Sequence, residues 1–273
     1  MEIIDLLKYT FFQNALLGGI LVSIACGMVG TYIVVRRLVF ISGGITHASF
    51  GGIGLGVFMG LNPIAVAWVF AIASGFGVEY LSTKHKLRED SAIAVLWALG
   101  MALGIIFLYL TPGYTLGMGE FLFGNILTIT TADIWLFAAL VIALFLVFMF
   151  MYRAILYVAF DVEYARVLKL PVKFIEYLMM FFVATTIVFS IRLVGIVLLM
   201  SLVTIPQITA DLFTHDFRKM MIISVLIAVV GCVGGLFISY FLNVPSGAFI
   251  ILLLIAFYGI GWIWKANFKP KHL

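Results

Sequence analysis

The sequence predicts an all-α polytopic membrane protein. Apolar residues make up 65% of the chain and charged residues only 10%, whereas soluble globular proteins have roughly 25% charged residues. The mean hydropathy is +1.25, so a soluble core of this size could not hide the apolar surface. Runs of roughly 20 apolar residues, the length that crosses a bilayer, recur along the chain. Counting them predicts eight or nine transmembrane helices in a single domain, residues 1–273.

The first half of the chain predicts four spans. The first, about residues 12–35, has small residues every fourth position, which makes it a candidate packing partner for the next helix; these are Gly19, Ser23, Gly27 and Thr31. The second, about 44–61, is short and rich in glycine. The third runs from Pro63 to about Leu81, and the fourth, about 91–110, ends before a Thr-Pro-Gly breaker.

The second half predicts an interrupted segment and five more spans. The segment after residue 113 contains Glu120, and we expect it to be re-entrant or interfacial. Thr130 and Asp133 have the spacing of a capping box before a fifth span, about 134–152. The last four spans are about 174–191, 193–213, a segment ending near 242, and a segment ending before residue 265.

The interval between the fifth and sixth spans, Arg153 to Lys173, is the longest polar one. Charged and apolar residues alternate there at helical spacing. This pattern indicates a short amphipathic helix outside the bilayer, which either offers a face to a soluble partner or only connects two spans. Nine crossings would place this interval and the other basic segments in the cytoplasm, with the N-terminus outside. The net charge of +4 comes from these loops and does not imply binding of nucleic acid.

The second span contains the candidate functional residue, His47. An ionisable side chain at membrane depth is costly unless a partner or a water-filled cavity receives it. Gly52 and Gly56 belong to one stripe of small residues, and Gly51 and Gly54 follow His47 on a neighbouring stripe. We therefore expect a helix that packs closely on one side, with His47 opening onto a hollow. A histidine that is hydrogen-bonded for structure only is the alternative.

Other features bear on the class of function. Pro206, in the seventh span, frees backbone carbonyls and marks a second wall for a polar path. The sequence contains no G-x-x-x-x-G-K-[ST] loop and neither H-E-x-x-H nor G-x-S-x-G, so we expect no ATP hydrolysis or proteolysis by this chain itself. Transport is the favoured class. A proton-driven secondary transporter would need acids inside the membrane, which are nearly lacking, and a noncatalytic membrane scaffold would need no polar path.

Several segments together resemble the permease subunits of bacterial ABC importers for zinc, manganese and related divalent metals. The resemblance covers nearly the whole chain. Its landmarks are Arg36, Arg37 and His47, and the segments Glu89–Ile105, Leu122–Leu127, Phe160–Pro171, Val194–Phe213 and Val244–Leu253.

This resemblance implies a type II importer permease in a bacterial cytoplasmic membrane. Such a permease forms a homodimer, binds two cytoplasmic ATPase subunits and receives its metal from an extracytoplasmic binding protein. The chain would bind no cofactor, and the divalent metal ion would be its substrate. Phe160–Pro171 would correspond to the coupling helix that seats in the ATPase, with Asp161, Glu163, Ala165 and Arg166 as the contact residues.

One position departs from the family pattern. Family members commonly have an aspartate four residues before the histidine, where this chain has Gly43. Without that carboxylate, an imidazole suits zinc better than manganese. Ser42, Thr46, Glu120 or the facing protomer could supply a replacement ligand, and a metal chelate is an alternative substrate. His47 is the main candidate for a transit ligand, and Glu120 is the second.

Overall fold

The structure, a computed structural model, describes residues 8–85, 88–113, 126 and 129–268. Those residues form helices and no strands, which confirms the all-α class. The helices are α2 (Thr10–Val35), α3 (Val39–Phe58), α4 (Pro63–His85), α5 (Glu89–Leu110), α7 (Thr131–Phe160), α8 (Val162–Val167), α9 (Val172–Asp211), α10 (Phe217–Leu242) and α11 (Ser246–Phe268). Glu120 lies outside the described residues.

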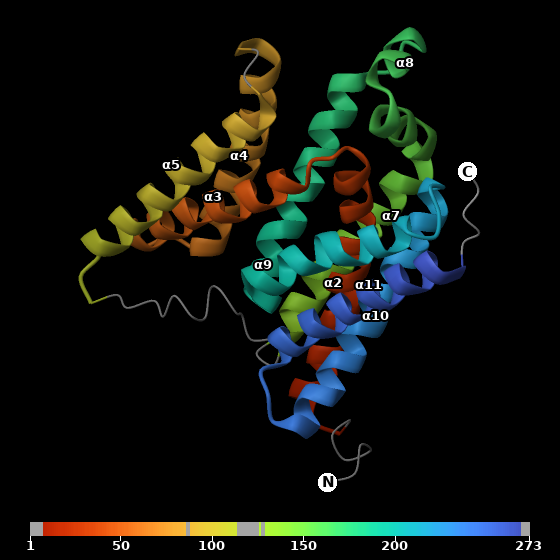
Figure 1. Cartoon of the computed structure of the whole chain (residues 1–273). Helices are drawn as coiled ribbons and strands as arrows, with labels where there is room; N and C mark the ends of the chain where they lie inside the picture. The colour runs from red at the N-terminus through yellow and green to blue at the C-terminus, as the bar shows by residue number, and fades with distance from the viewer. Residues whose placement is uncertain (1–7, 86–87, 114–125, 127–128, 269–273) are drawn as a thin grey trace.

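Within the described ranges, seven helices are long and apolar enough to cross a membrane: α2, α4, α5, α7, α9, α10 and α11. Helix α9 contains both the sixth and the seventh expected spans. They meet at Gly195, whose φ of 75° and ψ of 171° are not helical and are accessible to glycine. The helix changes direction there, as Figure 1 shows. Helix α3, the second expected span, is not among these seven, and glycines, hydroxyls and His47 interrupt its apolar residues.

Helix α7 begins at a side-chain cap and continues further than the sequence predicted. The Thr130 hydroxyl oxygen accepts a hydrogen bond from the Asp133 N–H at 3.3 Å, and the Asp133 carboxylate accepts one from the Thr130 N–H at 3.0 Å. The predicted capping box is therefore confirmed. At its other end α7 continues through Arg153 to Phe160, because no helix breaker interrupts the apolar residues before Asp161. The amphipathic interval is thus shorter than predicted, and its separate helix is only α8.

The small-residue stripe of α2 contacts α10. A Cβ atom on Gly19 would lie 2.9 Å from the sulfur of Cys232, and one on Gly27 would lie 2.9 Å from the Cα atom of Val225. The prediction that this stripe packs against the next helix in the chain is wrong. Helix α3 instead packs between α4 and α5.

Two groups of helices result, and α9 lies between them. Figure 1 shows α3, α4 and α5 together on one side and α2, α7, α10 and α11 on the other, with the first part of α9 between the two groups. Helix α8 lies at one end of the molecule. The end of α4 lies at the same end, opposite the N-terminus.

The contact between α3 and α4 depends on glycine. A Cβ atom on Gly52 would lie 2.6 Å from the Cα atom of Ala67, and one on Gly56 would lie 2.8 Å from the Cα atom of Pro63. Both distances are far below van der Waals contact, and the neighbouring atoms are backbone atoms that cannot rotate away. Any side chain at either glycine must therefore separate the two helices.

Replacing Gly52 with leucine is expected to destabilise the fold by about 1 to 3 kcal/mol or more, the usual cost of overpacking. Transport should fall together with the yield of folded protein. Gly259 in α11 is the matched control, because a Cβ atom there meets nothing within 4 Å. The measurement is the monodisperse yield and thermal midpoint in detergent. Equal values for Gly52→Leu and Gly259→Leu would show that this helix contact tolerates separation.

Candidate functional site

The position of His47 is set by a close contact between the backbones of α3 and α5. A Cβ atom on Gly51 would lie 2.7 Å from the carbonyl oxygen of Gly100, and one on Gly54 would lie 2.5 Å from that of Gly104. Glycines on both helices let the backbones approach closely. The stripe that includes His47 is therefore packed against α5.

The imidazole of His47 is half-buried and stacks on the indole of Trp97 in α5. The two ring centroids are 4.2 Å apart and the ring planes differ by 8°. The indole covers one face of the imidazole, where the sequence predicted little bulk. Sequence reasoning missed Trp97 because 50 residues separate it from His47; the glycines three and seven positions after Trp97 are the signal that could have placed it on this face.

The hydroxyls proposed as replacement ligands are directed into their own helix. The Ser42 hydroxyl donates to the Val39 carbonyl at 2.6 Å, and the Thr46 hydroxyl donates to the Ser42 carbonyl at 2.6 Å. Both side chains are buried. Among the described residues, no group of three or more His, Cys, Asp or Glu side chains could hold a metal ion. Within that part of the chain, His47 thus stands without a preformed ligand cluster.

Pro206 lies in the second part of α9, where a buried glutamine compensates for its missing N–H. The Gln207 amide donates to the carbonyl of Leu202 at 3.1 Å, which is the carbonyl that the N–H of residue 206 would normally reach. It also donates to the carbonyl of Cys26 in α2 at 3.0 Å. Gly30 gives it room, since a Cβ atom there would lie 2.8 Å from the Gln207 amide carbon. The carbonyl freed by the proline is therefore used to join α9 to α2.

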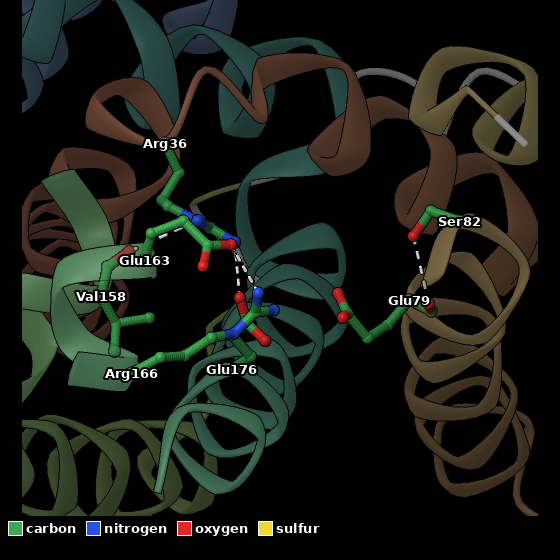
Figure 2. Close-up of polar contacts among 7 residues, drawn as sticks. All are labelled: Arg36, Glu79, Ser82, Val158, Glu163, Arg166 and Glu176. Carbon is green, nitrogen blue, oxygen red and sulfur yellow. Dashed lines mark hydrogen bonds and ion pairs between the residues drawn. The ribbon is translucent and has the colours of Figure 1, made fainter. Parts of the chain in front are cut away.

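A polar network at the α8 end of the molecule joins three helices through Arg36, the residue that follows α2. Its guanidinium lies 2.8 Å from a carboxylate oxygen of Glu176 in α9 and donates to the Val158 carbonyl of α7 at 3.3 Å. The two charged side chains are only 18% and 12% exposed. Figure 2 shows this pair, with Glu79 pointing from α4 towards Glu176.

Some of the predicted contact residues of helix α8 are exposed and one, Ala165, is buried. The Asp161 carboxylate accepts from the Tyr164 N–H at 2.9 Å and so caps the helix. Glu163 and Arg166 form an exposed ion pair, also drawn in Figure 2. Ala165 is 0% exposed, so it packs against its own protein and its prediction as a surface contact is wrong. Tyr164 and Val167, 49% and 77% exposed, form the apolar surface instead.

At the opposite end of α7, an ion pair that sequence reasoning missed fixes its first turn to α9. Arg192 lies 2.8 Å from the Asp133 carboxylate, which is almost fully buried. Arg192 precedes the Gly195 bend by three residues. The pair therefore holds the bend next to the start of α7.

The chain is similar to one protein family over nearly its whole length and to several known proteins. The model of the ABC 3 transport family matches residues 8–265. An uncharacterised membrane protein of Synechocystis is 39% identical over 250 residues, covering 92% of this chain and 89% of that protein. The manganese transport system membrane protein MntC of Listeria monocytogenes is 30% identical over 267 residues, covering 98% of this chain and 94% of that protein.

Two solved structures have a similar fold. The structure of PsaBC from Streptococcus pneumoniae in complex with Fab matches with a TM-score of 0.85 and 30% identity, covering 98% of this chain and 95% of that one. An inward-facing putative metal-chelate type ABC transporter matches with a TM-score of 0.73 and 16% identity, covering 92% and 85%. At that identity the second match supports the fold alone.

Proposed function

Because the chain belongs to the ABC 3 transport family, we propose that it is the membrane-spanning permease subunit of an ATP-driven importer for divalent metal ions, zinc or manganese. Family membership confirms the resemblance found in the sequence motifs. Two relatives of this length are named for manganese transport or manganese import. These names support a metal substrate, and the choice of metal depends on the residues around the path.

The main support for a metal path through this chain is the half-buried imidazole of His47. It is an ionisable group on helix α3, which packs between α4 and α5. A transit site must release its ion, so a single imidazole with open coordination positions is a suitable ligand. The Pro206 segment of α9 would form a second wall. Glu120 remains a proposed second ligand from outside the described residues.

The proposed partners are two cytoplasmic ATPase subunits, an extracytoplasmic metal-binding protein and a second copy of this chain. Helix α8 is the proposed ATPase contact, because it projects at one end of the molecule (Figure 1) and has an exposed apolar surface between charged side chains. Asp161 caps its first turn, and the Glu163–Arg166 ion pair lies beside the apolar surface formed by Tyr164 and Val167. This end would lie in the cytoplasm of a bacterium, with the N-terminus on the outer side.

Replacing Val167 with aspartate is expected to weaken copurification of the ATPase by at least about tenfold, because it places a charge in the apolar centre of the interface. The membrane domain should keep its yield, since Val167 is exposed in this chain. Val244→Asp, at the connection between α10 and α11, is the control for a charge added at an exposed valine. Unchanged copurification and uptake in Val167→Asp would contradict a role for α8.

The whole proposal is tested by reconstituting the permease with its ATPase and binding protein in liposomes. ATP-dependent entry of zinc or manganese that requires this chain is the expected result. Uptake of a chelated metal without uptake of the free ion would favour a chelate permease. Uptake driven by a proton gradient without ATPase would favour a secondary transporter, and no uptake by the assembled complex would favour a scaffold.

A further inference from the structure

The stacked pair of His47 and Trp97 has a fixed geometry. Gly100 and Gly104, on the same face of α5 as Trp97, hold α5 against the backbone of α3. The indole then lies parallel to the imidazole at 4.2 Å. Stacking covers one face of the imidazole, whereas the lone pair that would bind a metal ion lies in the ring plane, on the nitrogen that carries no proton, and points outward from the edge. Trp97 therefore orients His47 without occupying the positions where a metal ion would bind.

The same indole fills the space beside Gly43, one turn before His47. A Cβ atom on Gly43 would lie 3.4 Å from the Cζ3 atom of Trp97 and 3.3 Å from the terminal methyl of Met200 in α9. A methyl group here would already touch both side chains, so a longer side chain directed towards them must displace the indole or the Met200 methyl. An indole and a thioether thus stand where a side chain at residue 43 would project.

The thioether of Met200 is available as a weak, soft ligand. Its sulfur lies 3.7 Å from the Ser42 hydroxyl oxygen, but that hydroxyl has one proton and donates it to the Val39 carbonyl at 2.6 Å. The groups described beside Gly43 and His47 are therefore an indole that stacks on His47, a thioether next to Gly43 and Ser42, and the buried hydroxyls of Ser42 and Thr46. They include no carboxylate.

We propose that Trp97 is a specificity-determining residue that favours zinc over manganese at His47. The inference rests on the proposed function of His47 as a transit ligand. Manganese is bound mainly by oxygen ligands and has the lowest affinity of the divalent first-row metals, whereas zinc binds imidazole strongly. By fixing the imidazole plane and filling the space beside Gly43, Trp97 keeps oxygen ligands away from that side of the site.

The test uses the permease assembled with its ATPase and binding protein in liposomes, supplied with zinc or with manganese. The same binding protein serves every variant, so its own preference cancels when zinc-to-manganese uptake ratios are compared. Gly43→Asp alone should clash with the indole and lower uptake of both metals. Combined with Trp97→Ala, it should place a carboxylate beside His47 and lower the zinc-to-manganese ratio by at least about tenfold, the scale of effect of groups that tune a metal site.

Trp97→Phe is the conservative control, because it keeps an aromatic face for stacking and should keep the wild-type ratio. An unchanged ratio in the folded double variant would overturn the role of Trp97. Wild-type protein that transports neither metal would instead overturn the proposed function itself. If the double variant does not fold, tryptophan fluorescence provides the test. The emission of Trp97 is the wild-type spectrum minus the Trp97→Phe spectrum, and we expect zinc added to the assembled complex to change this difference. A difference spectrum that zinc leaves unchanged would overturn the inference.

Discussion

Replacing His47 with alanine is expected to reduce metal uptake by at least about tenfold, the loss that follows removal of a group that binds or tunes a metal. The imidazole is the only titratable group on α3, and its in-plane nitrogens are free of the stacked indole. Uptake of isotopically labelled zinc and manganese into liposomes with the assembled complex measures the effect. ATPase copurification should be unchanged, since the exposed residues of the proposed ATPase contact, Tyr164 and Val167, belong to α8 and not to α3.

A second substitution separates a ligand from a purely structural histidine. His47→Phe keeps a flat ring that can stack on Trp97 but has no lone pair for a metal ion. We expect it to fold like the wild type and to lose uptake as His47→Ala does. His215→Ala is the matched control, because His215 is exposed and pairs with Asp211 at 3.1 Å outside α3. Normal uptake by well-folded His47→Phe would refute the assignment and point to the Pro206 segment or Glu120.

The sequence predicted local structure well because local structure depends on residues that are neighbours in the chain. Apolar runs located the membrane helices, and the Thr130 and Asp133 pattern predicted the start of α7. The spacing of Gly52 and Gly56 predicted a close helix contact. The identity of a packing partner depends on residues far along the chain. The stripe on α2 therefore contacts Cys232 in α10, where no local signal pointed.

The same difference between local and long-range contacts explains which residues of the candidate site could be predicted from the sequence. His47 could be singled out because a lone ionisable group in an apolar segment is visible in one stretch of sequence. Its stacking on Trp97 depends on how α3 and α5 pack, and the bond from Gln207 to Cys26 joins positions 181 residues apart. Whether Ala165 faces a partner or its own bundle likewise depends on the tilt of α8, which a six-residue periodicity does not define.

Arg36 is expected to be needed for coupling between ATP hydrolysis and transport. It ends α2 three residues before α3 begins, and it contacts α7 and α9, the two helices that flank α8. Movement of α8 by the proposed ATPase would therefore reach α3 and His47 through this residue. Arg36→Ala also leaves Glu176 unpaired in a site that is nearly closed to solvent, where breaking a buried pair costs about 3 to 5 kcal/mol.

Stability and coupling can be separated by replacing both partners. Arg36→Ala and Glu176→Ala should each lower the thermal midpoint and abolish ATP-driven uptake. The double variant Arg36→Met/Glu176→Met should recover stability, because paired apolar residues of similar volume replace buried ion pairs at little cost. It should still fail to couple, since methionine donates no hydrogen bond to the Val158 carbonyl and forms no ion pair. Arg88→Ala is the control: its pair with Asp90 is 3.9 Å long and its side chain is 86% exposed, so it should change little. Full uptake by the stable double methionine variant would show that the Arg36 network only holds the helices together.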